Sequence, residues 1–380
     1  MRPRSAKPSH GTGPHLSLAW PLWLGYALLV VYASLYPFEG WRDQGVAPWA
    51  FLAAPWPRYW TAFDVVSNLV GYLPLGWLTT VALGRSGAAR LAWWGGVVAP
   101  TLLALGLEAA QTYLPRRVPS QADVVLNAAG ALLGATLAAW LLRERWLMPW
   151  VQFRRDWQRP GAQAAWALLL LWPAAVLAPT PVPFGTGHFG PAVQAALGDL
   201  LQDTLWQGWL PPPADATASP LGEAVLVALA LAVPLLLGYA SVRRRWQRAV
   251  WAAVLGVVAL ALGTLTAALA LGPAHASAWL TAPVRLGLAL AAALAVLTLP
   301  LGGRVAALGC VLMATALLVQ LNRVAEPAHL VEWLRPWRDA RYVHLHGLLR
   351  WWGWAWPVLA AWVAARLALL PAPSTYNRQP

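Results

Sequence analysis

Apolar segments, each about as long as a helix that crosses a membrane, follow one another through most of the chain. A spanning helix needs roughly 20 mostly apolar residues. Inside lipid, a helix satisfies its backbone hydrogen-bonding groups within the segment itself. The sequence therefore predicts an all-α, polytopic transmembrane helical bundle with about ten spans. We place these spans at 16–36, 65–83, 91–111, 123–142, 162–179, 223–240, 249–271, 284–301, 305–321 and 352–370.

Composition agrees with this fold class. Apolar residues make up 59% of the chain and charged residues 11%, whereas soluble domains carry roughly 25% charged residues. In a soluble protein the net charge of +13 would suggest a nucleic-acid partner. Here the basic residues lie in short loops between apolar runs, so we predict membrane lipids as partners and no nucleic acid. The single cysteine, Cys310, excludes an intrachain disulfide framework, and we predict no metal and no cofactor.

The distribution of arginine and lysine predicts the orientation. Basic residues concentrate in alternate loops, and cytoplasmic loops carry the excess of positive charge. This places the N-terminus in the cytoplasm, and an even number of spans returns the C-terminus to the same side. We therefore predict a multi-pass protein of the cell membrane. The expected segments are a cytoplasmic tail 1–15, a four-helix domain 16–145, a cytoplasmic linker 146–161, a six-span module 162–370 with external loops 180–222 and 322–350, and a cytoplasmic tail 371–380.

A short polar motif occurs twice in the first domain. The stretch from Asp64 to Gly71 recurs as the stretch from Asp123 to Gly130, and each copy opens a long apolar run. The aspartate and the asparagine of each copy lie one turn apart on the same helix face. Such a face is costly in lipid unless it is buried or used. The repeat therefore predicts two similar helical hairpins that face each other across one site.

Other polar residues are expected at the same outer surface. The span before the second copy runs in the opposite direction and ends with Glu108 and Gln111, and a short loop follows. Arg116 and Arg117 in this loop would lie outside the membrane, against the general charge bias. Arginine is suited to bidentate phosphate recognition. We assign no catalytic residue. The candidate ligand-binding residues are Asp64, Asn68, Glu108, Gln111, Arg116, Arg117, Ser120, Asp123 and Asn127.

In order and spacing, these residues resemble the VanZ-like family of membrane proteins. The resemblance rests on Asp64 and Asn68 running into Gly71-Tyr72-Leu73-Pro74-Leu75-Gly76, then on Glu108 and Gln111, and then on the segment from Arg116 to Gly134. It covers roughly residues 20–145 and implies a small helical membrane domain linked to the bacterial cell envelope. Reduced sensitivity to a lipoglycopeptide is implied only for the founding member. The resemblance does not supply a reaction, and residues 160–370 contain no motif that we can place.

Each candidate also has a structural interpretation. The Asp/Asn pairs can be helix caps and interhelical hydrogen bonds that hold the bundle together. Glu108 can form an ion pair with Arg116 or Arg117, or it can act as a general base while the arginines bind a phosphate. Close helix packing is the simplest explanation for Gly71, Gly76, Gly130 and Gly134. In the loop 322–350 we expect a solvated amphipathic segment rather than a metal site built from His329, Glu332, His344 and His346.

Three functions remain open at this point. The first is a non-enzymatic envelope protein that binds a lipid-linked or peptidoglycan-related ligand at its outer face and influences glycopeptide sensitivity or envelope assembly. The second is an intramembrane enzyme that acts on a lipid phosphate, with Glu108 or Asp123 as the base. The third is a transporter or flippase, which the repeat and the number of spans would fit. We favour the first, because few polar residues lie in mid-membrane.

Overall fold

The structure is a computed structural model, and the elements below are those of its described residues. The described residues are 19–36, 38–57, 61–143, 152–153, 155–209, 214, 216–338 and 343–369. Within these ranges the chain is helical, and the β-type pairing is a single isolated bridge between Gln158 and Val242. The chain divides into two compact units, residues 1–151 and 152–380.

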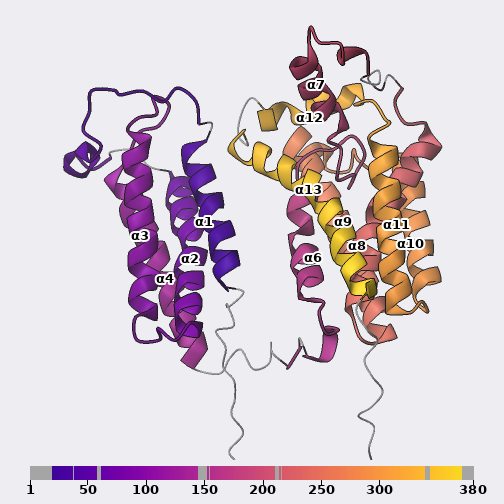
Figure 1. Ribbon diagram of the computed structural model, residues 1–380, viewed down its shortest axis with the longest axis horizontal. Coiled ribbons are helices and arrows are strands. Elements are labelled where there is room, and N and C mark those ends of the chain that lie inside the picture. Colours follow the sequence, from indigo (N-terminus) through magenta and orange to yellow (C-terminus); the bar gives the residue numbers. More distant parts are fainter. Residues whose placement is uncertain are drawn as a thin grey trace, which may run out of the picture. The chain divides into compact units, whose positions relative to one another are not determined.

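The first unit is a bundle of four helices. These are α1 (Ala19–Leu35), α2 (Ala62–Arg85), α3 (Ala92–Gln111) and α4 (Gln121–Arg143), with a short 3-10 helix, η1 (Ala50–Ala53), between the first two (Figure 1). The helix α2 contacts each of the other three, and its longest interface is with α4. Short loops connect α2, α3 and α4, so these neighbours run antiparallel and the start of α4 lies beside the start of α2.

Glycines let α2 and α4 approach each other closely. A Cβ atom on Gly130 would overlap the carbonyl of Leu69, and one on Gly134 would overlap the carbonyl of Leu73. Gly76 meets the backbone of α4 in the same way. The predicted close packing is therefore confirmed for these three glycines. For Gly71 it is wrong, because a Cβ there would meet nothing within 4 Å.

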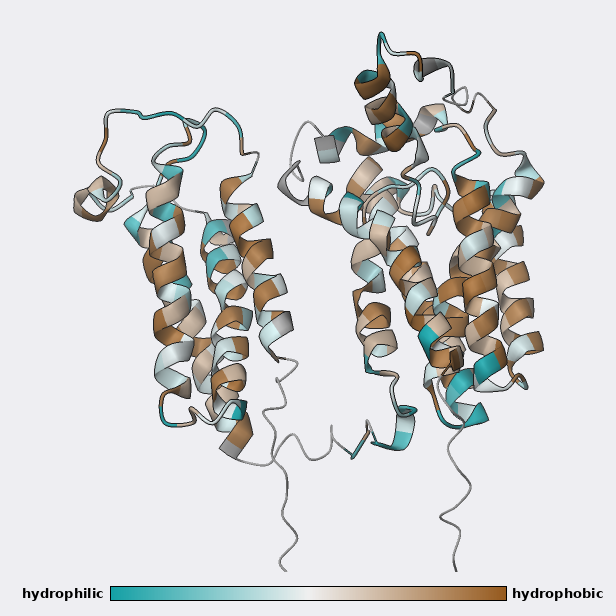
Figure 2. Cartoon of the chain, in the orientation of Figure 1, coloured by the Kyte–Doolittle hydropathy of each residue, from teal (hydrophilic) through white to brown (hydrophobic). Residues whose placement is uncertain are grey.

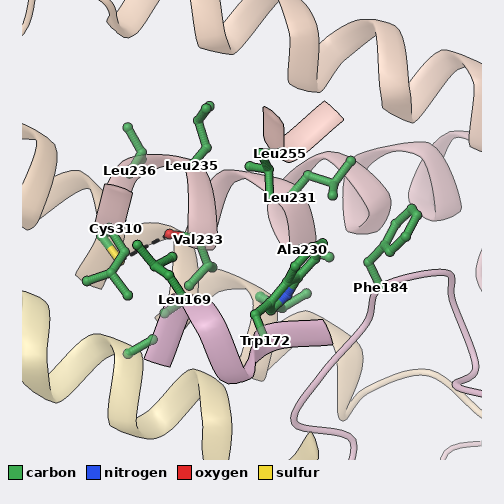
Figure 3. Packing of buried hydrophobic residues seen from close by; sticks show 14 of the residues in the cluster. Leu169, Trp172, Phe184, Ala230, Leu231, Val233, Leu235, Leu236, Leu255 and Cys310 are labelled. Atoms are coloured by element: carbon green, nitrogen blue, oxygen red, sulfur yellow. Dashed lines mark hydrogen bonds between the residues drawn. The ribbon is translucent and has the colours of Figure 1, made fainter. Parts of the chain in front are cut away.

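The second unit is built around α8. Its helices are α6 (Gln163–Val176), α7 (Gly190–Leu201), α8 (Pro220–Ser241), α9 (Arg245–Leu271), α10 (Ala282–Thr298), α11 (Gly303–Leu321), α12 (Ala328–Arg338) and α13 (Val343–Leu369), with two short 3-10 helices, η2 (Gln207–Trp209) and η3 (Pro273–His275). The helix α8 contacts α6, α9, α10, α11 and α13. Its second half is buried on all sides, and the thiol of Cys310 donates to the Val233 carbonyl at 3.5 Å (Figure 3). A helix that is apolar all round is expected at such a central place.

A helix is present at each predicted span, and apolar residues cover most of these helices (Figure 2). Six helices in the described part are long and apolar enough to cross a membrane, namely those of residues 64–85, 92–111, 121–142, 220–241, 245–271 and 303–321. Three further apolar helices are shorter, namely those of residues 22–35, 163–176 and 282–298. The all-helical fold, with several helices long and apolar enough to span a membrane, is therefore confirmed for the described residues. The count of ten spans and the cytoplasmic position of both termini stay predictions.

Two of the predicted external loops contain more structure than expected. Most of residues 177–189, which include the start of the predicted external loop 180–222, are buried inside the second unit. The helix α7 also lies within this predicted loop and ends at Leu201. Within 322–350, α12 is amphipathic, but its apolar residues Leu330, Leu334 and Trp337 are buried against the protein. The side chains of His329 and His344 lie outside the described residues.

Candidate functional site

The two copies of the repeated motif meet at one end of the four-helix unit. The Nδ2 atom of Asn68 in α2 donates a hydrogen bond to Oδ1 of Asp123 in α4, at 3.0 Å. Both residues are partly buried. A polar contact of this kind between membrane helices is worth about 0.6 kcal/mol on average. The asparagine of the first copy is thus held by the aspartate of the second.

The other acid of the repeat has a local role. Asp64 is exposed, and its carboxylate accepts hydrogen bonds from the backbone N–H of Thr61, at 2.9 Å, and from the Thr61 hydroxyl, at 2.8 Å. The Thr61 hydroxyl in turn accepts from the Asp64 N–H. This is a capping box, which satisfies free N–H groups at the start of α2. The structure therefore gives Asp64 the helix-cap role.

Glu108 is buried near the end of α3. Its side chain is among the most enclosed polar groups of the unit, at 5% exposure. Oε2 accepts a hydrogen bond from the backbone N–H of Ser120 at 2.8 Å, and the Ser120 hydroxyl accepts from the N–H of Ala122 at the start of α4. These contacts join the end of α3 to the beginning of α4.

An ion pair with an arginine was one of the two interpretations of Glu108. Within the described part of the chain, neither Arg116 nor Arg117 forms an ion pair with Glu108. Arg117 instead donates from Nη2 to the carbonyls of Ala33, at 3.1 Å, and Tyr36, at 3.2 Å. These carbonyls end α1, where a cation is favoured. Burial lowers the pKa of Arg117, and the charge of Glu108 opposes this shift.

Gln111 has the same role as Arg117. Its Nε2 atom donates to the carbonyl of Ser34 at 3.1 Å, so two side chains fasten the end of α1 to the loop after α3. Arg116 is exposed. Of the two arginines that were predicted as phosphate ligands, one is thus engaged by backbone carbonyls and the other lies at the surface.

Asn127 lies one turn further along α4 than Asp123. It is 4% exposed, and its Oδ1 atom has no hydrogen-bond partner in the described part of the chain. A buried carbonyl oxygen without a donor costs about 1–3 kcal/mol. The second copy of the motif therefore contains an acceptor that the first copy does not satisfy.

A segment that the sequence analysis did not single out covers this polar end. Phe51 of η1 is buried against Ala109 and Val124. Gln44 donates to the carbonyl of Thr112 at 2.6 Å, and Gln121 donates to the carbonyl of Ala54 at 2.7 Å. The loop between α1 and α2 is therefore tied down over the ends of α3 and α4. The signal available in the sequence was an apolar stretch, Ala50-Phe51-Leu52-Ala53, inside a predicted loop.

The resulting cluster is dominated by acceptors. The carboxylates of Glu108 and Asp123 interact electrostatically, and the Asn127 carbonyl oxygen lies one turn away along α4. Such a set can accept hydrogen bonds from hydroxyl, amide or ammonium donors. The structure thus brings together Asn68, Glu108, Ser120, Asp123 and Asn127, while Gln111 and Arg117 hold α1 beside them. It leaves Asp64 and Arg116 exposed. That these residues bind a ligand stays a prediction.

Comparison with known proteins identifies the first unit. A family model described as VanZ/LLP1 matches residues 16–143, which is the N-terminal third of the chain. No curated protein and no solved structure matches the chain. The predicted resemblance to the VanZ-like family is confirmed for this domain.

Proposed function

We propose that the VanZ/LLP1 domain in the N-terminal third of this chain binds a lipid-linked or peptidoglycan-related ligand at the outer face of the bacterial plasma membrane. The observation that carries the proposal is the buried Oδ1 atom of Asn127, which has no partner among the described residues and lies one turn from Asp123, in a cluster that also buries Glu108. Buried acceptors are normally hydrogen-bonded, so an unsatisfied one needs an explanation, and a donor from a ligand would supply it.

The chemistry of the cluster favours a donor-rich ligand. Sugar hydroxyls, peptide amides and amines all donate hydrogen bonds, and envelope precursors carry these groups next to a phosphate. Glu108, Asp123 and Asn127 supply the acceptors. Since Arg117 is engaged by the carbonyls at the end of α1, the exposed Arg116 is the arginine available for a phosphate. Binding would withdraw or present a precursor and thereby alter glycopeptide sensitivity or envelope assembly, without a chemical reaction.

Native mass spectrometry of the purified full chain tests this function. The probe is a polyprenyl-pyrophosphate-linked muropeptide, with a polyprenyl pyrophosphate that lacks the sugar as the reference. We expect the variants Asp123→Asn and Asn127→Ala to lower occupancy by the muropeptide about tenfold, which corresponds to the loss of one hydrogen bond to a charged or buried group. Asp64→Asn is the matched control, because it makes the same chemical change in an exposed cap. Equal binding by Asp123→Asn and the wild type would overturn the proposal.

A second candidate function is enzymatic. It is favoured by one observation, namely that two acids, Glu108 and Asp123, lie within electrostatic range of each other in a largely closed site. One of them could take a proton from a nucleophile while the other stays in place. Release of phosphate from the pyrophosphate probe by the wild type, abolished in Glu108→Gln, would favour this candidate over simple binding.

Transport is less well supported by the first unit. The deeper buried polar residues of α2 are Thr79 and Thr80, and their hydroxyls donate to the helix's own carbonyls, at Leu75 and Gly76. Described polar groups therefore do not continue from the cluster through the bundle as a path for a polar substrate.

A further inference from the structure

The second unit contains a buried segment of irregular backbone between α6 and α7. Most of residues 177–189 are buried, although the segment forms no helix. Phe184 has φ of 65° and Gly187 has φ of 94°. A phenylalanine in the left-handed region costs free energy, and such residues persist where the surrounding structure requires them. Irregular backbone packed among apolar helices must also satisfy its polar groups within the protein.

Asn322 at the end of α11 holds this segment in place. Its Nδ2 atom donates to the carbonyl of Gly187 at 2.9 Å, and its Oδ1 atom accepts from the N–H of Gly190 at 2.6 Å. The N–H of Gly187 in turn donates to the carbonyl of Gly353 in α13 at 2.9 Å. The segment is therefore fixed between α11 and α13, beside the first turns of α7.

A small polar cavity opens beside this segment. Its volume is about 70 Å³, and its lining includes His188, Glu326, His346 and Arg350. His188 is 8% exposed, with Nδ1 at 4.0 Å from Oε1 of Glu326 and Nε2 at 3.4 Å from the carbonyl of Val324. One water needs roughly 10–15 Å³ measured in this way. The cavity thus has room for a polar group considerably larger than one water molecule.

An apolar groove continues from the cavity along α7 and α13. It has a volume of about 600 Å³ and is lined by Phe189, Ala192, Val193, Ala196, Trp351 and Ala355. Arg350 and Trp354 line both the cavity and the groove. The guanidinium of Arg350 lies over the Trp354 ring, at 4.5 Å from its centroid. The helix α7 has no fully buried residue, so its apolar side is only partly covered by the described parts of the chain.

We propose that the cavity and the groove together form a binding site for a zwitterionic phospholipid whose headgroup carries a phosphate and a primary ammonium. The phosphate meets Arg350, the ammonium meets Glu326, and one acyl chain lies in the groove. The proposal rests on the placement of one acid and one guanidinium in a single cavity, with an apolar channel that begins at the guanidinium. It concerns the second unit and does not depend on the function proposed for the first.

Charge complementarity selects this headgroup among common phospholipids. A primary ammonium donates hydrogen bonds to a carboxylate, whereas a trimethylammonium group has no N–H to donate. An anionic headgroup with a glycerol presents a phosphate to Arg350 but offers no ammonium to Glu326. Burial lowers the pKa of His188, with a smaller contribution from Arg350, so His188 adds little positive charge at neutral pH.

The test is lipid retention by the delipidated full chain in detergent, measured by native mass spectrometry. The probes are phosphatidylethanolamine, phosphatidylcholine and phosphatidylglycerol with identical acyl chains. We expect the ethanolamine lipid to be retained about tenfold better than the other two, as one additional charged hydrogen bond would give. Equal retention of the choline lipid, or better retention of the glycerol lipid, would overturn the proposal.

Variants separate the contributions of the headgroup and the chain. Arg350→Gln should lower retention of the ethanolamine lipid, and Arg350→Lys, which keeps the charge, should restore part of it. Glu326→Gln should remove the advantage of the ethanolamine lipid over the choline lipid. The matched controls are Arg335→Gln and Glu332→Gln, which change exposed residues of α12 outside the cavity lining.

One variant tests the groove without touching the charges. Ala196→Glu places a carboxylate on the exposed side of α7 and should weaken retention of all three lipids. Unchanged retention in this variant would contradict the placement of the chain. If Arg335→Gln had the same effect as Arg350→Gln, the binding would come from general surface charge and the site would be wrong.

Discussion

Asn68 and Asp123 belong to different copies of one motif, and the hydrogen bond between them, at 3.0 Å, joins α2 to α4. The bond has no counterpart in the other direction. Asp64, which would be the equivalent partner of Asn127, caps its own helix through Thr61. The repeat is therefore used asymmetrically. In addition, the Oδ1 atom of Asn127 is buried and finds no donor among the described residues. The buried Asn127 of the second copy is what makes this end of the bundle a candidate site.

The coupling between Asn68 and Asp123 is measurable. In a double-mutant cycle of Asn68→Ala and Asp123→Ala we expect an interaction free energy of about 0.6–1.7 kcal/mol, the range found for polar contacts between membrane helices. Reversible unfolding in detergent provides the measurement. A cycle of Asn68→Ala with Val125→Ala, an exposed position on α4, should give a coupling near zero. No coupling in the first cycle would contradict the contact.

The close approach of α2 and α4 predicts different effects of one substitution at three glycines. Gly130→Ala and Gly134→Ala would force a methyl group against backbone carbonyls, which cannot move without shifting the helix. We expect each to lower the free energy of unfolding by about 1–3 kcal/mol. Gly71→Ala in the same helix pair meets open space and should change it by less than about 0.5 kcal/mol. Thermal unfolding of the three variants checks this order.

Substitutions of the adjacent residues Arg116 and Arg117 should also differ in their effect on stability. Arg117→Ala removes the donor that satisfies two carbonyls at the end of α1, so we expect a loss of about 1–2 kcal/mol in unfolding free energy. Arg116→Ala changes an exposed side chain and should leave stability within about 0.5 kcal/mol of the wild type. Equal losses in both variants would show that Arg117 does not fasten α1.

Phe51 should control access to Glu108. Since η1 packs over Ala109 and Val124 through this ring, Phe51→Ala should increase the rate at which a water-soluble carbodiimide modifies Glu108. Peptide mass spectrometry gives the site and the rate. Leu52→Ala, which changes a side chain that is 47% exposed in the same turn, is the control and should leave the rate unchanged.

His188 makes the stability of the second unit depend on pH. Its folded-state pKa is lowered from the ordinary value of 6.5, first by burial and also by Arg350, while the Val324 carbonyl and Glu326 oppose the shift. The folded state therefore favours the neutral ring. This stabilisation is complete above pH 6.5 and is lost as the pH falls below that value toward the folded-state pKa.

Unfolding temperatures measured between pH 8 and pH 5 test this dependence. Glu326, His346 and Arg350 line the same cavity as His188. The decrease near pH 6 should be smaller in His188→Gln than in the wild type. It should persist in His275→Gln, which changes an exposed histidine of η3. A wild type with a flat profile would contradict the prediction.

The positions of the helices could be read from the sequence because the apolar pattern and the spanning length leave few alternatives. The convergence of Asp123, Glu108 and Ser120 followed from the alternating direction of the helices. The cap at Asp64 could also have been recognised, since Thr61 stands three residues before it, which is the spacing of a capping box. In each case the information lies within one helix or in the direction of its neighbours.

The partners of individual side chains could not be read in this way. Whether Arg117 reaches Glu108 or the end of α1 depends on which helix lies beside it, and nothing in the local sequence encodes that neighbour. The burial of the segment 177–189 was not predicted, because proline and glycine are typical of loops, which usually lie at the surface. It contains no charged residue apart from the titratable His188, and that lack of charge was the sign that it could be buried.

The glycine contacts between α2 and α4 also mean that the parts of the first unit differ in how firmly they are held. Two helices in backbone contact cannot slide or rotate without a steric clash, so this pair is rigid. The loop 38–57 and the end of α1 are held instead by side-chain hydrogen bonds, which can break one at a time. A ligand would thus enter on the side formed by the loop and the end of α1, and changes in specificity would arise there, while the α2–α4 pair preserves the shape of the unit.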